Sequence, residues 1–305
     1  MSNEEQWNLD KRPHTRTKLE IFRKYSYVWL TIWNKKNLFA NQWYYIDLFA
    51  GRGNHTYRGE VVYGSPLIFL EQINNKLTST SSKLRKEIKI NIFLVEKNKE
   101  NFNYLENNIN SFMNEHSILK DCVKIYTFND DCNIAIDNIL ENIINDPRNP
   151  LLAIIDPYGI KIKATTTKKI VLLKNPKEIF FNYILEGVRR VAGVEKKSHL
   201  KDSLTEKEIS TIETFYDFMG RSKDTIDKDD IDILTDFVEE IFLGRQLKVI
   251  AYDMKYFDRK DVLYYLLFAT KKGNIKDIIR KIFKKQKEQI SGPDLFEQEF
   301  LEFGE

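Results

Sequence analysis

Tyr44-Tyr45-Ile46-Asp47-Leu48-Phe49-Ala50-Gly51-Arg52-Gly53 is the stretch of sequence that decides the fold of this chain. An apolar run that carries one acid and stops at a glycine pair is typical of a buried parallel strand entering a tight turn. Glycine permits positive φ and, having no Cβ, lets the backbone approach a ligand closely. In doubly wound sheets, ligands bind at the carboxyl end of such a strand. The sequence therefore predicts an α/β fold with a ligand site at Gly51 and Gly53.

The residues after this turn predict a helix that begins near Gly64-Ser65-Pro66, with Ser65 as a candidate N-cap and Pro66 at the first helical position. The pattern is not a dinucleotide fingerprint, because the third glycine would fall on Thr56, and no Gly-Lys-Ser/Thr of a P-loop follows. Asp-x-Phe-Ala-Gly-x-Gly instead resembles the first motif of class I methyltransferases that use S-adenosylmethionine (SAM). The resemblance implies that Asp47, Phe49, Gly51 and Gly53 belong to a cofactor site.

Length and composition indicate a folded protein. The chain has 305 residues, 42% hydrophobic and 13% aromatic, which is enough for one large domain or two small ones and excludes global disorder. There is no run of 18 apolar residues and no signal-peptide pattern near Met1, so we expect a cytoplasmic protein without a membrane segment. Cys122 and Cys132 fit a reducing compartment as buried small hydrophobes, and no Cys/His spacing predicts a metal site.

Charge is unevenly distributed along the chain. Residues 11–36 carry eight Lys/Arg against one acid, and residues 271–288 carry eight against two. Residues 201–245 reverse the sign, with thirteen acids and six bases. Basic ends with an acidic insert predict a nucleic-acid face. Solvated helix faces explain the same pattern equally well, so both interpretations stay open.

The N-terminal part predicts a flexible lead-in over residues 1–13, followed by an amphipathic helix from Thr15 to about Lys36. The aromatic stripe of this helix favours a core role over base stacking. The loop from Arg52 to Tyr63 contains a short stretch at Glu60 that can pair as a β-ribbon beside the glycine turn.

Two further predicted strands end in acids that suit a nucleoside ligand. Residues 89–96 are apolar and end in Glu96, where a carboxylate can accept both hydroxyl hydrogens of a ribose diol. A surface Glu or an N-cap partner for the helix over 98–113 is the alternative. The strand over 123–128 is followed by Asp131 at a predicted helix start, which capping alone explains. In the methyltransferase arrangement Asp131 would accept from the adenine amine.

A third apolar strand ends in Asp156-Pro157-Tyr158-Gly159. Asp156 can accept a hydrogen bond from an amine, the carbonyl before Pro157 can accept another, and Tyr158 can stack on a planar base. Such groups orient an exocyclic amine and take its proton. A plain β-turn is the alternative, and we favour catalysis by Asp156, Pro157 and Tyr158.

The remaining chain predicts a strand over 178–184, whose end carries Asn182-Tyr183, and a helical acidic insertion. Runs at 247–254 and 262–270 predict a hairpin, the helix over 274–289 is basic on one face, and the apolar C-terminal end is expected to dock. The expected organisation is a helical segment (1–40), a Rossmann-like core (41–185), the insertion (186–245) and a hairpin with basic helix completing the core (246–305).

Taken together, these residues resemble the three-Cys-motif partner proteins, a family of bacteria and phages built like class I methyltransferases. The matching pieces include the helix containing His14, Lys18 and Tyr25, the stretch 45–51, Gly64-Ser65-Pro66, Glu96, Asp131-Cys132-Asn133 and Asp156-Pro157-Tyr158-Gly159. The resemblance implies a sheet of seven strands with the last antiparallel, SAM as cofactor, and a partner with three clustered cysteines that resembles radical-SAM proteins.

The sequence predicts a SAM-dependent methyltransferase acting on an exocyclic amine, on nucleic acid through residues 11–36 and 271–288. The Asp-Pro-Tyr-Gly tip also resembles the Asp-Pro-Phe-Gly of tRNA guanine N2-methyltransferases, and it lacks the second proline of the Asp/Asn-Pro-Pro-Tyr of DNA adenine enzymes. That departure favours RNA or an unusual amine over duplex adenine. Two alternatives stay open. One is a catalytically silent SAM- or nucleotide-binding partner module; the other is a nuclease-like protein of a mobile-element or phage-defence system.

Overall fold

A computed structural model describes residues 7–36, 40–80, 83–198, 204–221, 228–255, 261–291 and 300–304. The chain divides into two compact units. Unit 1 comprises residues 1–154, 174–176 and 274–296, and unit 2 comprises residues 155–173, 177–273 and 297–305. None of the helices in the described ranges combines the length and the apolar character needed to cross a membrane.

Unit 1 is built on parallel strands, as the apolar runs predicted. β1 (Gln42–Asp47) pairs in parallel with β4 (Lys89–Val95) on one side and β6 (Leu151–Ile155) on the other, and β4 pairs in parallel with β5 (Val123–Phe128). Because the chain crosses first to β4 and β5 and only later to β6, the strand order reverses between β1 and β6. Ligands of open α/β sheets bind at such a switch point, beyond the carboxyl ends of the strands.

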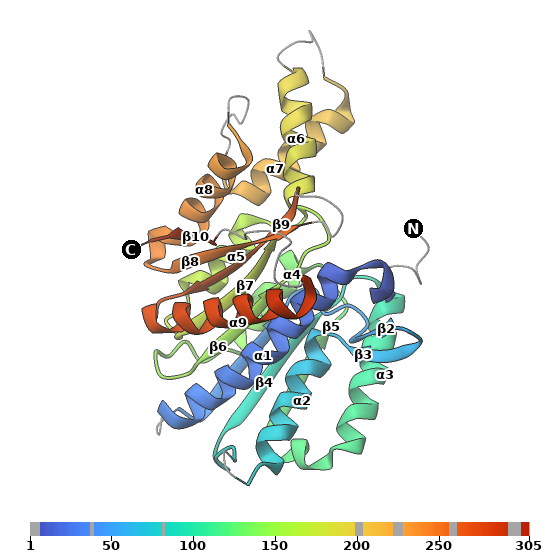
Figure 1. The fold of residues 1–305 in the computed structure, drawn as a ribbon, viewed down its shortest axis with the longest axis vertical. Helices are drawn as coiled ribbons and strands as arrows, with labels where there is room; N and C mark the ends of the chain where they lie inside the picture. The colour runs from blue at the N-terminus through green and yellow to red at the C-terminus, as the bar shows by residue number, and fades with distance from the viewer. Residues whose placement is uncertain are drawn as a thin grey trace. The chain divides into compact units, whose positions relative to one another are not determined.

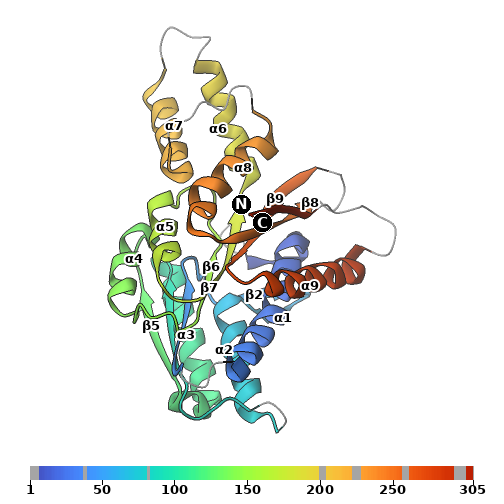
Figure 2. The same ribbon diagram turned by 90° about the vertical axis from the view of Figure 1, so that its left-hand side faces the viewer.

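Helices cover the strands of unit 1 on both faces. α1 and α2 lie side by side in Figure 1, and Figure 2 shows α4 on the opposite face of the strands. The predicted aromatic stripe of α1 is core, since Tyr25, Trp29 and Trp33 are buried. The helical elements of unit 1 are η2 (Leu9–Lys11), α1 (Pro13–Lys36), α2 (Ser65–Thr78), α3 (Lys99–Glu115), η3 (Ser117–Asp121), α4 (Cys132–Glu141) and α9 (Gly273–Ser291, with Gly273 assigned to unit 2).

The loop after β1 folds as the predicted β-ribbon, with β2 (Asn54–Tyr57) antiparallel to β3 (Glu60–Tyr63). The lead-in prediction for residues 1–13 is wrong from residue 7 onward. Leu9 is 1% exposed, and Asn8 forms a parallel bridge with Thr56 of β2. Burial of Leu9 helps to hold this segment in a fixed position. The mostly polar composition of residues 1–13 did not predict such order. Residues 1–6 lie outside the described residues.

Unit 2 is an antiparallel arrangement with helices. β7 (Lys177–Tyr183) pairs with β9 (Val262–Thr270), β9 pairs with β8 (Lys248–Lys255), and β8 pairs with β10 (Phe300–Phe303). The predicted hairpin is therefore confirmed, and the apolar C-terminal end docks as the edge strand β10. The helices are α5 (Ala164–Leu172), α6 (Leu185–Ser198), α7 (Glu206–Met219), α8 (Asp230–Ile241) and η4 (Leu243–Arg245), of which α6, α7 and α8 form the predicted helical insertion.

Pairing orders the strands of the main sheet as β10-β8-β9-β7-β6-β1-β4-β5, so the fold is α/β with a mostly parallel sheet. The prediction of seven strands with the last antiparallel is wrong in its count. The sheet has eight strands, because Phe300–Phe303 adds antiparallel to β8. The sequence predicts that this short apolar stretch docks on the protein, but not that it does so as a strand.

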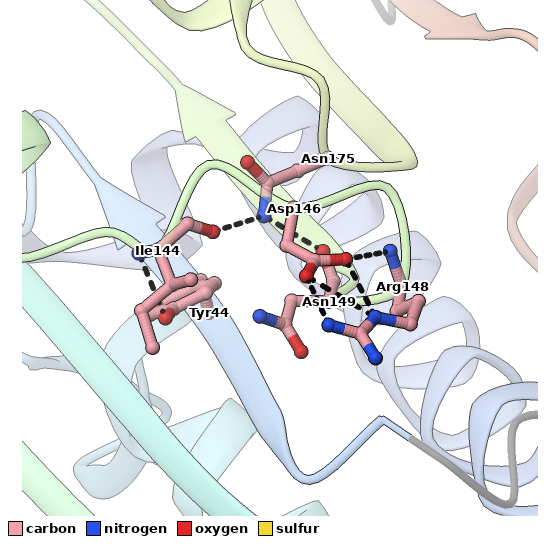
Figure 3. A network of polar contacts seen from close by, with 6 residues as sticks. All are labelled: Tyr44, Ile144, Asp146, Arg148, Asn149 and Asn175. Atoms are coloured by element: carbon pink, nitrogen blue, oxygen red, sulfur yellow. Dashed lines mark hydrogen bonds and ion pairs between the residues drawn. The ribbon is translucent and has the colours of Figure 1, made fainter.

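A polar network holds the loop that leads into β6 (Figure 3). The Ile144 N–H donates to the Tyr44 hydroxyl of β1 over 3.0 Å, and the Asn175 amide donates to the carbonyls of Ile144 and Asn149 at 3.1 and 2.8 Å. Nearby, the side-chain hydrogen bonds from Arg148 hold the pKa of Asp146 at about 2. Buried carbonyls need such partners, since a loop supplies no ladder of its own.

We expect Asn175→Ala to lower the free energy of unfolding by about 1–3 kcal/mol, because it leaves the buried Asn149 carbonyl and the part-buried Ile144 carbonyl without their donor. Urea unfolding followed by circular dichroism measures the change. Asn142→Ala is the matched control, since Asn142 is exposed and donates only to the Asn138 carbonyl within its own helix end. An equal loss in both variants would contradict the proposed importance of the network.

Candidate ligand site at the glycine turn

The carboxylate of Asp47, at the end of β1, organises the turn. Asp47 is fully buried and accepts hydrogen bonds from the Phe49 N–H at 3.1 Å, the Ser65 hydroxyl at 2.6 Å and the Tyr45 hydroxyl at 3.2 Å. One side chain thus joins the strand, the turn and the start of α2. The buried Asp47 carboxylate therefore fixes the shape of the turn through these hydrogen bonds. Phe49, also predicted in the site, is partly exposed.

Ser65 is not the N-cap of α2, contrary to the prediction. The helix includes Ser65, its N-cap is Gly64 without a side-chain cap, and the Ser65 hydroxyl donates to Asp47 instead. The Ser65 hydroxyl therefore bonds to the end of β1 and lies inside the helix rather than at its N-cap position. The prediction failed because the tertiary partner of Ser65 lies 18 residues earlier in the chain.

The two glycines adopt the left-handed conformation that the sequence predicted, with φ of +61° at Gly51 and +79° at Gly53. The Gly53 carbonyl accepts from the Gly64 N–H at 2.8 Å, which closes the loop around the β2–β3 ribbon. A Cβ on Gly51 would stand 2.6 Å from the nearest ring atom of Trp7. The close approach that glycine allows is therefore made here by an indole.

Glu96 lies at the tip of β4, where the ribose acceptor was predicted. The Asn98 N–H donates to its carboxylate over 2.7 Å, and the Gly51 N–H is a second backbone partner. Burial raises the pKa of Glu96, and these N–H donors oppose the shift without cancelling it. The carboxylate is thus held against the glycine turn, partly buried, beside the switch point.

Asp131 is the N-cap of α4, which is the simpler of its two predicted roles. Its carboxylate accepts from the Asn133 N–H at 2.8 Å and from the Lys97 ammonium at 2.9 Å. Burial disfavours its ionisation, but the hydrogen bonds from Lys97 and Asn133 outweigh this effect and lower its pKa. Any adenine amine would share Asp131 with Lys97, whose side chain is 74% exposed.

Arg52, between the two glycines, is held by neighbours from α3. Its Nε donates to Asn101 at 2.8 Å, its Nη2 meets Glu100 at 3.3 Å, and its guanidinium carbon lies 4.4 Å from the Tyr104 ring centroid and 5.4 Å from that of Trp7. A planar cation between two rings is favourable. Besides the buried Asp47 carboxylate, the glycine turn therefore carries the Glu96 carboxylate and the Arg52 guanidinium, which pairs with Glu100.

The Asp156 tip belongs to unit 2. Asp156 is half-buried and accepts a 2.7 Å hydrogen bond from the Asn182 amide of β7, while Tyr158 is 71% exposed and Pro157 is buried. Burial, followed by the charge of Asp156, raises the pKa of Tyr264. In the part of the chain that the structure describes, the buried Asn182 Oδ1 has no hydrogen-bond partner. An acceptor is thus present beside the Asp156 carboxylate.

Sequence reasoning assigned no role to two residues of these sites. Trp7 lies in a polar segment and gave no periodic signal. Asn182 had a signal, as an amide in the otherwise apolar run of β7, but only the fold brings it to Asp156, 26 residues away.

The basic segments are partly neutralised in the fold. Arg23 of α1 meets Glu20 at 3.6 Å and pairs with Glu71, and Arg280 of α9 pairs with Asp277 at 2.7 Å. The side chains of residues 11, 36 and 286–288 lie outside the described residues. Within the described part, no three His, Cys, Asp or Glu side chains gather as metal ligands. Cys122 and Cys132 are buried, as predicted, and burial raises their pKa to about 11 and about 12.

Comparison with known proteins shows no matching family model and no matching curated protein. A Legionella pneumophila (strain Philadelphia 1) protein of the family described as DUF519 is similar in structure, with a TM-score of 0.46 and 11% identity over 95% of this chain and 96% of that one. An rRNA-methylase candidate of Clostridium thermocellum gives a TM-score of 0.34 and 10% identity over 81% of this chain and 95% of that one. Both TM-scores lie below 0.5, so neither similarity bears on this chain's activity. The relation to the three-Cys-motif partner proteins stays a prediction.

Removing the Asp47 carboxylate should destabilise unit 1 strongly. Asp47→Ala leaves the buried Tyr45 hydroxyl and the part-buried Phe49 N–H and Ser65 hydroxyl without their acceptor, and we expect a loss of about 3 kcal/mol or more in the free energy of unfolding. Ser65→Ala removes one of the three donors and should cost about 1 kcal/mol. Urea midpoints measure both, and a smaller loss for Asp47→Ala than for Ser65→Ala would contradict the central role of Asp47.

Proposed function

We propose that the protein is a SAM-dependent methyltransferase that acts on an exocyclic amine, on nucleic acid. One observation carries the proposal. At the switch point beside β1, a turn with two left-handed glycines is backed by the Glu96 carboxylate, which accepts backbone N–H bonds at the tip of β4. A glycine turn and an acid at these two strand ends are the parts that a nucleoside ligand requires.

The residues of unit 1 fit SAM in chemistry. Glu96 has the carboxylate that a ribose diol needs, Asp131 offers an acceptor for the adenine amine, and Gly51, Gly53 and Phe49 line the turn that Asp47 holds. When bound, SAM supplies an electrophilic methyl group on a sulfonium. The protein's part is to hold the nucleoside at the glycine turn and to fix Glu96 there through its backbone N–H partners.

In unit 2, we propose that Asp156, Pro157 and Tyr158 bind the substrate amine that receives the methyl group. The Asp156 carboxylate accepts a hydrogen bond from the amine and takes up the proton that the amine loses when its nitrogen bonds to the methyl group. The exposed Tyr158 ring stacks on the base. Asn182 acts as a positioning residue, because its amide donates to Asp156 and so holds the orientation of the carboxylate.

We also propose a cytoplasmic location and a partner protein with three clustered cysteines, resembling radical-SAM proteins. Nucleic acid would contact the exposed Lys and Arg side chains of residues 11–36 and 271–288. The second candidate function is a silent SAM-binding module for that partner. It is favoured by the engagement of Asp131 with Lys97 and α4, which leaves part of the site occupied by the protein's own groups. Residue chemistry gives no comparable support to a nuclease-like activity in phage defence.

Binding of SAM should depend on the ionisation of Glu96. Glu96 serves both ribose hydroxyls only as the carboxylate, and burial raises its pKa above the usual value for a glutamate. Affinity for SAM should therefore fall on acidification, and the fall should begin at a higher pH than for an ordinary glutamate. Glu96→Gln should bind SAM about 10- to 100-fold more weakly and lose this pH dependence. Calorimetric titration measures both, with the exposed Glu115→Gln as control. A Glu96→Gln variant with unchanged affinity would contradict the ribose role.

Methyl transfer should depend on Asp156 without any change in SAM binding. With labelled SAM and pools of RNA, DNA or partner protein, we expect Asp156→Asn to slow transfer about 100-fold or more and Asn182→Ala about tenfold. The exposed Glu186→Gln on α6 is the control. Transfer that survives Asp156→Asn would contradict the acceptor role, and SAM binding without transfer to any pool would favour the binding module.

A further inference from the structure

Trp7 contacts the glycine turn, and the proposed function has so far given it no role. Its ring edge lies on Gly51, with the atoms Cη2 and Cζ3 at 2.6 and 2.8 Å from the place where a Cβ would stand. The ring also packs against His55, with the two ring centroids 5.3 Å apart, and against the Arg52 guanidinium. The indole therefore forms a wall of the turn at Gly51.

The segment that carries Trp7 is held in place by specific contacts. Asn8 bridges Thr56, Leu9 is buried, and the Asp10 carboxylate accepts from the Arg58 N–H at 2.9 Å. These contacts attach residues 8–10 to the β2–β3 ribbon and so place the indole over the turn.

The indole N–H is the second, independent observation. Among the described residues, Trp7 Nε1 is buried and has no hydrogen-bond acceptor. Such a donor costs free energy in the free protein and gains a partner when an acceptor arrives. The Arg52 guanidinium lies 5.4 Å from the ring centroid and pairs with Glu100, but it has five N–H donors, so an acceptor that is also an anion suits this place.

The same glycine is touched from a second direction by Glu96, through the Gly51 N–H. A carboxylate there selects a diol, while the indole N–H and Arg52 select an anion. We propose that Trp7 is a ligand-binding residue, whose N–H, with Arg52 beside it, binds the carboxylate of a nucleoside that carries an amino acid. The inference rests on the proposed function and names the residue that separates SAM-like ligands from plain nucleosides.

The experiment compares four ligands by calorimetric titration: SAM, S-adenosylhomocysteine, methylthioadenosine, which has no amino-acid carboxylate, and AMP, which has a phosphate instead. Trp7→Phe keeps an aromatic ring but removes the N–H together with part of the indole that contacts Gly51. The difference between ligands, rather than the loss of affinity as such, therefore reports on the N–H. We expect Trp7→Phe to weaken SAM and S-adenosylhomocysteine about fivefold to tenfold and methylthioadenosine less than twofold. Tyr27→Phe on α1 is the control, since the 44% exposed Tyr27 ring contacts Lys76 rather than Arg52 or Gly51 and the change should alter none of the affinities.

A second readout uses the wild-type protein, so it does not depend on the folding of a variant. The chain has four tryptophans, and one of the four ¹⁵N-indole signals should shift with S-adenosylhomocysteine but not with methylthioadenosine. A Trp7→Phe variant that weakens all ligands equally, or none, would overturn the inference and leave the proposed function standing. A selective loss for AMP would reassign the anion to phosphate. A wild-type protein that binds neither SAM nor S-adenosylhomocysteine would overturn both.

Discussion

The buried carboxylate of Asp47 is the constraint on which the candidate site depends. A fully buried acid is tolerated only where donors surround it, and here the donors come from the strand, the turn and the first residue of α2. Satisfying that one charge fixes the direction in which the chain leaves β1. The glycines that follow then have little freedom, and their left-handed conformation closes the turn onto Gly64.

Two side chains meet at Gly51, and their chemistry is opposite. Glu96 offers an acceptor at the Gly51 N–H, and the outer ring of the Trp7 indole packs over the Gly51 Cα, while the indole N–H is buried without an acceptor. A residue with a Cβ would collide with the indole, so Gly51 is required both by its φ and by its neighbour. The site is therefore polar on one side and aromatic on the other, around a single backbone position.

In unit 2, the Asp156 tip follows the same physical rule on a smaller scale. A carboxylate that must be oriented receives a donor from an amide, here the Asn182 side chain of β7. The buried amide is held in turn by its strand, since Asn182 pairs in register with Leu266 of β9. Positioning of the proposed base thus comes from the sheet rather than from the loop that carries Asp156.

The sequence by itself determined the elements whose signals are local: the apolar run of β1, the positive-φ glycines, the aromatic core stripe of α1 and the acids at the strand ends. Only the tertiary structure decided what those groups contact. Ser65 turned from helix cap to partner of Asp47, a polar lead-in brought Trp7 onto Gly51, and the chain's end became the eighth strand. Local patterns report backbone preference and burial, whereas a hydrogen bond or ring contact between residues tens of positions apart depends on the packing of the whole unit.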